Sequence, residues 1–273
     1  MTDKIPIAMP TYNRPHYLRQ TLGALRGCAS LDRFRIITSE EEHDATRALW
    51  GEVAAEGWID VERHTHPGVW GCARNVVAAS DYGAAAGPWF LLLEDDMLLA
   101  DDALDMAIWC AGILTDHPDV HSFNLYSQDL KALPGADYDP NVLRFNDWFT
   151  CRVWGAASDM WRRVRADYDP CRERCFERTS WAWPVNVWRN HHKLWSINPA
   201  LSRVQYIGEH GTFGDSNNFQ DKVVKAWVGD WPHKNKLTRE YRLTSAERER
   251  RDDLPIRKMG ARFAPAFREG WDK

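Results

Sequence analysis

Short apolar runs alternate with segments of helical periodicity through the first half of the chain. The run Trp89-Phe90-Leu91-Leu92-Leu93 has no polar interruption, which is typical of a strand buried on both faces of a sheet. Apolar residues spaced three or four apart, such as Leu18, Leu22 and Leu25, predict helices between such runs. The pattern predicts an α/β fold with a mostly parallel sheet flanked by helices. The expected strands are 5–9, 34–38, 58–63, 89–93 and 120–126, and the expected helices are 16–28, 44–56, one ending near 86, and 101–114.

The second half of the chain is less regular. We expect a loop at 127–141, a strand at 145–154, a short helix at 158–166, a Trp-rich helix at 178–192 and an extended segment at 195–207. Residues 1–221 are predicted to form one domain, with a nucleotide-binding half at 1–126 and an acceptor half at 127–221. Residues 222–273 have few large aliphatic side chains and are predicted to be an extension or lid.

Charge is distributed unevenly along the chain. The full chain has a net charge of −4, yet residues 222–273 hold 14 Lys and Arg against 8 Asp and Glu. A basic extension behind an acidic body suits a polyanionic partner, although a solvated tail of mixed charge has the same composition.

The composition and the lack of a long apolar stretch indicate a globular protein rich in tryptophan. The 15 tryptophans suit stacking platforms for sugars or bases, or a core rich in indoles. No stretch of about 18 apolar residues is present, so we expect no membrane insertion. The first ten residues do not form a signal peptide, which predicts a cytoplasmic protein with free thiols at its six cysteines. Cys171 and Cys175 lack a second close pair to complete a zinc site.

Three acidic residues, Glu94, Asp95 and Asp96, follow the apolar run directly. Ligands of open α/β sheets bind at the carboxyl ends of the strands, and three carboxylates there repel one another. A hard divalent cation such as Mg²⁺ or Mn²⁺ relieves that repulsion. The alternative is an acidic loop in which Asp101 or Asp102 caps the next helix.

Four segments, in order, resemble those of GT-A glycosyltransferases. Ile7-Ala8-Met9-Pro10-Thr11-Tyr12-Asn13-Arg14-Pro15 is similar to the opening strand and loop of that fold, and Gly71-Cys72-Ala73-Arg74-Asn75 to the Gly-x-x-Arg-Asn element of family 2 enzymes. Glu94-Asp95-Asp96 resembles the DxD-type metal motif, in the form found in the N-acetylglucosaminyltransferase I group. Pro199-Ala200-Leu201-Ser202-Arg203, followed by Gly208 and Gly211, is similar to a later segment of the same group.

The resemblance implies a GT-A fold and a set of site residues. Asp96 would bind the metal directly, while Glu94 and Asp95 would contact the ribose and metal-bound water. Glu40 would accept from the uracil N–H, and Arg74 would neutralise phosphate or orient Asp95. His210, between two glycines, would be a further metal ligand. The residues expected to bind the nucleotide sugar are Pro10, Thr11, Tyr12, Asn13, Arg14, Glu40, Arg74, Glu94 and Asp95.

One element of the N-acetylglucosaminyltransferase I group is absent. The Trp-Asp-Asp-Trp element that carries its general base is replaced here by Trp181-Ala182-Trp183-Pro184. Three explanations remain: another acid is the base, with Glu177, Asp169 and Asp159 as candidates; the enzyme is retaining and needs none there; or the chain binds a nucleotide sugar without turning it over. Trp181 and Trp183, together with Arg203, are predicted to bind the acceptor, although both tryptophans would equally suit the core.

The expected function is metal-dependent transfer of a sugar from a nucleoside diphosphate sugar, with UDP as the expected nucleotide. The acceptor is either a saccharide or a hydroxylated base in phage-type DNA. The alternatives are a sugar- or nucleotide-binding module without turnover, and a nucleotidyltransferase. The sequence leaves the sugar, the anomeric outcome and the oligomeric state open.

Overall fold

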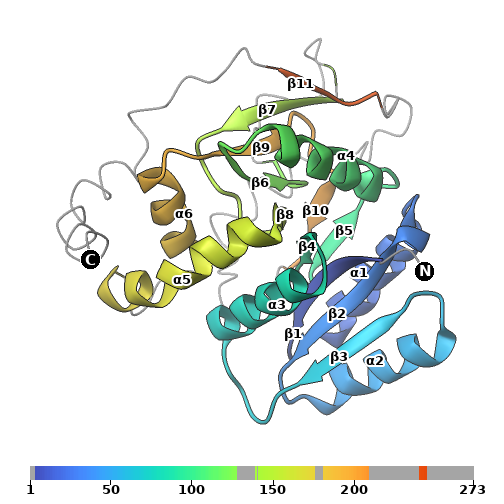
Figure 1. The fold of residues 1–273 in the computed structure, drawn as a ribbon. Helices are drawn as coiled ribbons and strands as arrows, with labels where there is room; N and C mark the ends of the chain where they lie inside the picture. Colours follow the sequence, from blue (N-terminus) through green and yellow to red (C-terminus); the bar gives the residue numbers. More distant parts are fainter. Residues whose placement is uncertain (1–3, 128–138, 140, 176–180, 209–239, 245–273) are drawn as a thin grey trace.

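The computed structural model describes residues 4–127, 139, 141–175, 181–208 and 240–244. In this part of the chain a nine-stranded sheet has the order β11-β7-β9-β6-β8-β4-β1-β2-β3, and β5 and β10 form a second, two-stranded sheet. Helices cover both faces of the large sheet (Figure 1). The expected α/β class, with a mostly parallel sheet flanked by helices, is confirmed.

The first half of the chain builds alternating strands and helices, as its apolar pattern predicts. Strands β1, β2, β3 and β4 pair in parallel in the order β4-β1-β2-β3, so their carboxyl ends meet at one edge. The elements are β1 (Ile5–Thr11), α1 (Pro15–Arg26), a 3₁₀ turn (Leu31–Arg33), β2 (Phe34–Glu40), α2 (Asp44–Glu56), β3 (Val61–Thr65), α3 (Cys72–Ala86) and β4 (Trp89–Leu93).

The second half departs from the predicted elements in several places. The single strand expected at 145–154 is wrong: two strands flank residues that turn out of the sheet, where Asn146 Oδ1 accepts from Trp148 N at 3.0 Å. The helix expected at 158–166 continues to Cys175, and the extended segment 195–207 divides into two strands. The elements are β5 (Met97–Leu99), α4 (Ala103–Asp116), β6 (Val120–Asn124), β7 (Val142–Asn146), β8 (Val153–Ala157), α5 (Ser158–Cys175), α6 (Ala182–His191), β9 (Trp195–Pro199), β10 (Val204–Tyr206) and β11 (Arg242–Thr244).

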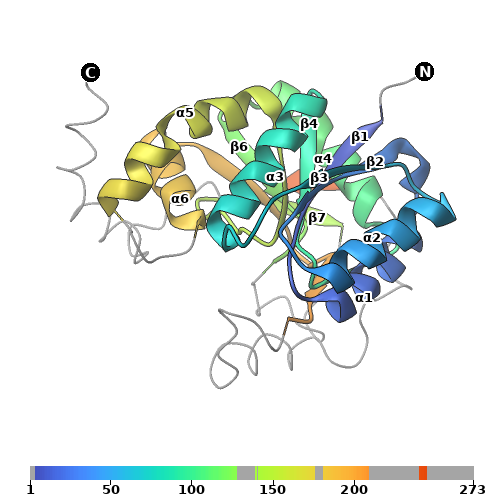
Figure 2. The same ribbon diagram turned by 90° about the horizontal axis from the view of Figure 1, so that it is seen from below.

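Alternate residues of the central strands serve two separate cores. Ile7 and Leu91 pack with the apolar faces of α1, α2 and α4, whereas Ala8 and Leu92 pack with those of α3, α5 and α6. Figure 2 shows α3 and α5 on one side of the sheet and α1 and α2 on the other. Both faces of β4 are therefore buried, which explains its uninterrupted apolar sequence.

Strand β8 lies between β4 and β6 and is antiparallel to both. Its first residue, Val153, pairs with Leu93 at the carboxyl end of β4, and its last residue, Ala157, pairs with Trp89. Gly155 leaves room for Phe123, because a Cβ at residue 155 would lie 2.2 Å from the Phe123 ring. The start of β8, rather than its end, therefore lies beside the acidic residues.

Part of the predicted extension joins the main sheet. Strand β11 pairs in parallel with β7, and the Tyr241 hydroxyl donates to Asp102 Oδ2 at 2.9 Å. Apart from 240–244, residues 222–273 lie outside the described part of the chain. Among the described residues, no helix has both the length and the apolar composition needed to cross a bilayer. Cys28, Cys72, Cys110 and Cys151 are free thiols, as expected.

His121 is a fully buried histidine in β6 whose two ring nitrogens have no hydrogen-bond partner. Burial, with Arg189 and Arg163 nearby, lowers the pKa of His121 to about 3 from an ordinary 6.5. Between these pKa values the unfolded chain binds a proton that the folded chain does not. The contribution of His121 to stability is therefore present above pH 6.5 and lost as the pH falls towards 3.

We therefore expect His121→Leu to flatten the pH dependence of stability. Relative to the variant, the wild type should lose about 1.4 kcal/mol of unfolding free energy per pH unit below pH 6. Urea unfolding of both proteins at pH 4.5, 5.5 and 7.5 measures the difference in their free energies of unfolding. The contributions of other titrating groups cancel in that difference. Parallel curves for the two proteins would show that His121 is protonated, or accessible to water, in the native state.

Candidate active site

The acidic stretch lies at the edge where several strand ends meet. Strands β1 and β4 are parallel, and their register of Ile7 with Leu91 carries Thr11 to the level of Asp95. The carboxyl end of β6 reaches the same edge, since Leu125 N donates to Val153 O at 2.9 Å. Residues distant in sequence therefore converge around Glu94, Asp95 and Asp96.

The turn that carries the three acids is fixed through its backbone. The buried hydroxyl of Thr21, in α1, donates to Asp95 O at 2.9 Å and accepts from Met97 N at 3.0 Å. Ile207 N donates to Asp96 O at 2.9 Å. A Cβ at residue 208 would lie 2.3 Å from Asp96 Oδ2, so glycine at this position permits the close approach of the two segments.

Arg14 bridges the two aspartates. Its Nη1 donates to Asp96 Oδ2 at 2.6 Å, and its Nη2 donates to Asp95 Oδ1. The side chains of Asp95 and Asp96 are 3% and 2% exposed, and that of Arg14 is 28% exposed. The second oxygen of Asp96, Oδ1, is buried without a hydrogen-bond partner. Arg14 was expected near the nucleotide, and the structure places it among the acids.

Burial is the main cause that raises the pKa of Glu94, Asp95 and Asp96, and repulsion from neighbouring carboxylates also raises the pKa of Glu94 and Asp95. Arg14 acts in the opposite direction on all three, and Arg152 does so on Glu94 and Asp96. Full ionisation of the three carboxyl groups is therefore unfavourable without a further positive charge. This is the electrostatic condition under which a bound cation is stabilised.

The acids fit a divalent metal ion by their chemistry. Carboxylate oxygens are the ligands that Mg²⁺ and Mn²⁺ prefer, and Asp96 Oδ1 is an unsatisfied buried acceptor within the acidic group. No group of three or more His, Cys, Asp or Glu side chains within the described residues is arranged to enclose a metal. A bound ion would therefore need further oxygens from substrate or water. The predicted ligand His210 lies outside the described residues.

A second cation and two tyrosines complete the acidic edge, and none of them was identified from the sequence. Arg152, the residue before β8, lies 3.7 Å from the ring centre of Tyr206 and 5.3 Å from that of Tyr126. Burial acts to lower the pKa of Arg152, but Tyr126 and Glu94 act in the opposite direction and the pKa is raised. No local pattern in the sequence marks Arg152. It could have been found only by predicting that β8 pairs antiparallel with β4, which brings residue 152 next to residue 94.

The carboxyl ends of β1 and β2 carry polar side chains that are held by buried hydrogen bonds. Asn75 is buried; its Oδ1 accepts from Ser39 at 2.6 Å, and its Nδ2 donates to Thr11 O at 3.1 Å. Glu40 is also buried and accepts two hydrogen bonds from Arg63, at 2.8 and 2.7 Å. Thr38 donates to the same carboxylate at 2.6 Å. A uracil N–H would have to share Glu40 with Arg63.

The loop before α3 is held by Glu41, which the sequence analysis did not identify. The buried Glu41 carboxylate accepts from Trp70 N at 2.9 Å and from Gly71 N at 3.2 Å. The Trp70 ring stacks on His66 at 3.7 Å, and Arg74 lies over Trp70 at 3.8 Å. Arg14, rather than Arg74, pairs with Asp95, so the expectation that Arg74 orients Asp95 is not met. Arg74 is an exposed, preordered cation.

Of the other residues expected to bind nucleotide, Pro10 and Thr11 end β1, Tyr12 is half-buried and Asn13 is exposed. Thr11 Oγ1 accepts from the Trp50 indole at 3.2 Å. Tyr12 lies edge-on to His43 with ring centres 6.2 Å apart, and its carbonyl accepts from Thr46. These contacts fix the strand end that a nucleotide would approach.

Two of the predicted bases are described, and both are exposed and paired with arginines of α5. Asp159 follows β8, whose last residues pair with the beginning of β4, about 15 Å of strand away from Glu94. Its carboxylate is exposed and pairs with Arg162. Asp169 is exposed on α5 and pairs with Arg165 at 2.5 Å. The third candidate, Glu177, lies outside the described residues.

The residues predicted to bind the acceptor are mainly structural. Trp181 is buried among Phe149 and Trp154, so it fills the core. Trp183 is half-buried, with its ring 5.9 Å from that of Trp148. Arg203 is fully buried and donates to both oxygens of Asp102, at 3.0 and 2.9 Å. Arg203 therefore has no surface from which to contact an acceptor.

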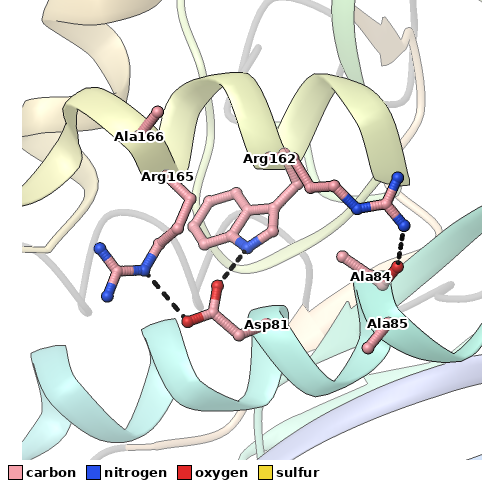
Figure 3. A pocket seen from close by; sticks show the side chains of 7 residues that line it. Asp81, Ala84, Ala85, Arg162, Arg165 and Ala166 are labelled. Atoms are coloured by element: carbon pink, nitrogen blue, oxygen red, sulfur yellow. Dashed lines mark hydrogen bonds and ion pairs between the residues drawn. The ribbon is translucent and has the colours of Figure 1, made fainter.

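A pocket between α3 and α5 lies elsewhere on the molecule (Figure 3). Asp81 accepts from the Trp161 indole at 2.8 Å and from Arg165 Nε at 3.0 Å, and Arg162 donates to Ala84 O at 3.0 Å. These contacts tie the two helices together. The pocket lies towards the C-terminal end of α3, away from the acidic edge, and we assign it a packing role.

No protein-family model matches the chain, and no curated protein matches it. The solved structures that resemble it include S. aureus TarS 1–349, with a TM-score of 0.50 and 10% identity over 76% of this chain and 61% of that chain. The chain shares the fold of that protein. At this identity the likeness concerns the fold alone.

Two further solved structures are glycosyltransferases by name. Mannosyltransferase PcManGT from Pyrobaculum calidifontis, in complex with GDP-Man and Mn²⁺, has a TM-score of 0.45 and 16% identity over 59% of this chain and 46% of that chain. The apo form of glycosyltransferase GlyE from Streptococcus pneumoniae TIGR4 has a TM-score of 0.48 and 10% identity over 71% of this chain and 44% of that chain. The chain thus spans about half the length of these structures.

Proposed function

We propose that this chain is a metal-dependent glycosyltransferase of the GT-A type that uses a nucleoside diphosphate sugar, with UDP as the expected nucleotide. The observation that carries the proposal is the acidic group Glu94, Asp95 and Asp96 at the carboxyl end of β4, in which both aspartates are buried and which Arg14 and Arg152 flank. The shared fold with TarS 1–349 supports it, and that protein has also been solved with UDP.

The chain's residues suit the departure of a sugar from a diphosphate. Negative charge grows on the leaving phosphate, and a bound divalent ion would act there as a Lewis acid. Asp96 would hold that ion through its unpartnered oxygen, while Arg152 and Arg74 would add positive charge at the edge. The ends of β1 and β2, fixed by Asn75, would receive the nucleoside.

Nucleotide-dependent protection against thermal unfolding tests the proposal. The unfolding midpoint should rise with UDP or a UDP-sugar in the presence of Mn²⁺, and rise less with the nucleotide alone. Release of UDP from UDP-sugars, with and without added acceptors, then measures turnover. If no nucleoside diphosphate or its sugar raises the midpoint with Mn²⁺ or Mg²⁺ present, the proposed function is wrong.

The acceptor is a hydroxyl group of a saccharide or of a hydroxylated base in DNA. Salt separates the two, because binding to a phosphate backbone weakens steeply as salt increases. Transfer to DNA should fall by orders of magnitude between 50 and 200 mM salt, whereas transfer to a saccharide should change little.

A second candidate is a protein that binds nucleotide sugars without turning them over. The position of Asp159 favours it, since this candidate base follows the end of β8 that lies opposite the acidic group. Protection by UDP and Mn²⁺ without UDP release from any UDP-sugar would identify this function.

A further inference from the structure

We propose that Arg14 is an internal counter-ion that occupies the acidic site until a divalent cation displaces it, so that metal and diphosphate bind cooperatively. The inference rests on the proposed function and extends it to the order of events at the site. Its basis is the position of one guanidinium, which bridges the same two carboxylates that a metal ion would bind.

Arg14 and a metal ion would compete for the same place. The guanidinium takes Asp96 Oδ2 and Asp95 Oδ1, which leaves Asp96 Oδ1 as the buried oxygen without a partner. Gly208 also lies close to Oδ2, since a Cβ at residue 208 would be 2.3 Å from that oxygen. A divalent ion bound at Asp96 would lie within a few Å of the guanidinium, and the two positive charges would repel each other.

Arg14 can be released without disturbing the fold around it. Its carbonyl accepts from Tyr17 N at 3.1 Å and from Leu18 N at 3.0 Å, so the backbone holds the start of α1 independently of the side chain. Its side chain is also 28% exposed, against 3% and 2% for Asp95 and Asp96, so Arg14 is the most solvent-accessible of the three.

The buried pair Arg203–Asp102 provides a contrast within the same protein. There both side chains are only 1–2% exposed, and the Tyr241 hydroxyl also donates to the carboxylate. That pair is enclosed on all sides and holds the segment before β10 in place. Arg14 is instead a cation that lies partly open to solvent over enclosed acids, which is the arrangement expected of an exchangeable partner.

Release of Arg14 would leave a free guanidinium at the edge where the diphosphate has to meet the metal. A guanidinium fork matches phosphate oxygens and forms charge-assisted hydrogen bonds with them. The metal would thus make Arg14 available to the nucleotide, and the nucleotide would keep Arg14 away from the metal site. By thermodynamic linkage, each ligand then increases the affinity of the other.

Titration with Mn²⁺ alone, followed by calorimetry or by the spin-resonance signal of the free ion, tests the competition. Arg14→Gln should bind Mn²⁺ about tenfold more tightly than the wild type, since the competing charge is gone. Arg14→Lys retains a charge without the fork and should fall between them. Arg19→Gln, which removes an exposed partner of Glu52 from the same helix, should match the wild type.

The same titrations with UDP present test the cooperativity. UDP should tighten Mn²⁺ binding to the wild type by a larger factor than binding to Arg14→Gln. An equal or weaker affinity of natively folded Arg14→Gln for Mn²⁺ alone would overturn the inference, whatever the activity. If the wild type transfers sugar but Arg14→Gln shows no gain in Mn²⁺ affinity, the proposed function stands and the inference falls. If Arg14→Gln instead gains Mn²⁺ affinity but no nucleotide binds to either protein, the competition between Arg14 and the metal is supported and the proposed function is wrong.

Discussion

Asp96→Asn should reduce sugar transfer about 100-fold or more, because it removes the charged oxygen expected to hold the metal ion. Asparagine has nearly the shape of aspartate, so the turn held by Thr21 and Ile207 should remain. Binding of UDP in the presence of Mn²⁺ should weaken in parallel, while binding without metal should change little. Transfer kinetics and calorimetry with and without Mn²⁺ measure the two effects.

Two further variants make the result for Asp96 specific. Asp60→Asn removes an exposed partner of Lys4 far from the acidic edge and should leave transfer unchanged. Asp95→Asn retains Asp96 and should cause a smaller loss. Full activity of Asp96→Asn would exclude Asp96 as the metal ligand. If both aspartate variants lose transfer activity but retain wild-type affinity for Mn²⁺, the acids act only through Arg14.

Arg203→Ala should lower the free energy of unfolding by about 3–5 kcal/mol, because it leaves the buried carboxylate of Asp102 without its charged partner. The Tyr241 hydroxyl remains as a donor to Asp102 and cannot replace a cation. Asp102 begins α4, and Arg203 precedes β10, so the loss should loosen the contact between these segments. Equilibrium unfolding in urea measures the change.

An exposed ion pair provides the matched comparison. Arg26→Ala removes the partner of Glu56, where both side chains are more than half exposed, and should cost no more than about 1 kcal/mol. If Arg203→Ala costs as little as Arg26→Ala, Asp102 must gain water or a proton in the variant. A stable, folded Arg203→Ala with impaired acceptor binding would instead restore the acceptor role predicted from sequence.

The parallel half of the fold could be predicted from sequence because its signals are local. Helix α2 has the predicted bounds, and β4 was found from five apolar residues whose two faces contact two separate cores. Strand β5 was not predicted, because three residues after an acidic turn carry no periodic signal. Its pairing with β10 depends on residues more than 100 positions apart.

The acidic part of the site could also be found from sequence, but its partners could not. A strand followed by three acids is a local pattern, whereas the choice between Arg14 and Arg74 as the partner of Asp95 depends on packing. The same limit applies to Trp181 and Arg203. A Trp or Arg in a motif looks the same in sequence whether it faces a ligand or is buried.

The antiparallel direction of β8 affects how easily this protein can change its specificity. In a purely parallel sheet, only segments that follow strands reach the ligand edge. Here a segment that precedes a strand reaches it too, and Arg152 enters the site in this way. Changes in length or sequence just before Val153 would reshape the acidic edge while leaving the register of β8 with β4 intact. For the proposed sugar transfer, the connection into β8 is therefore a place where acceptor preference could be changed at little cost to the fold.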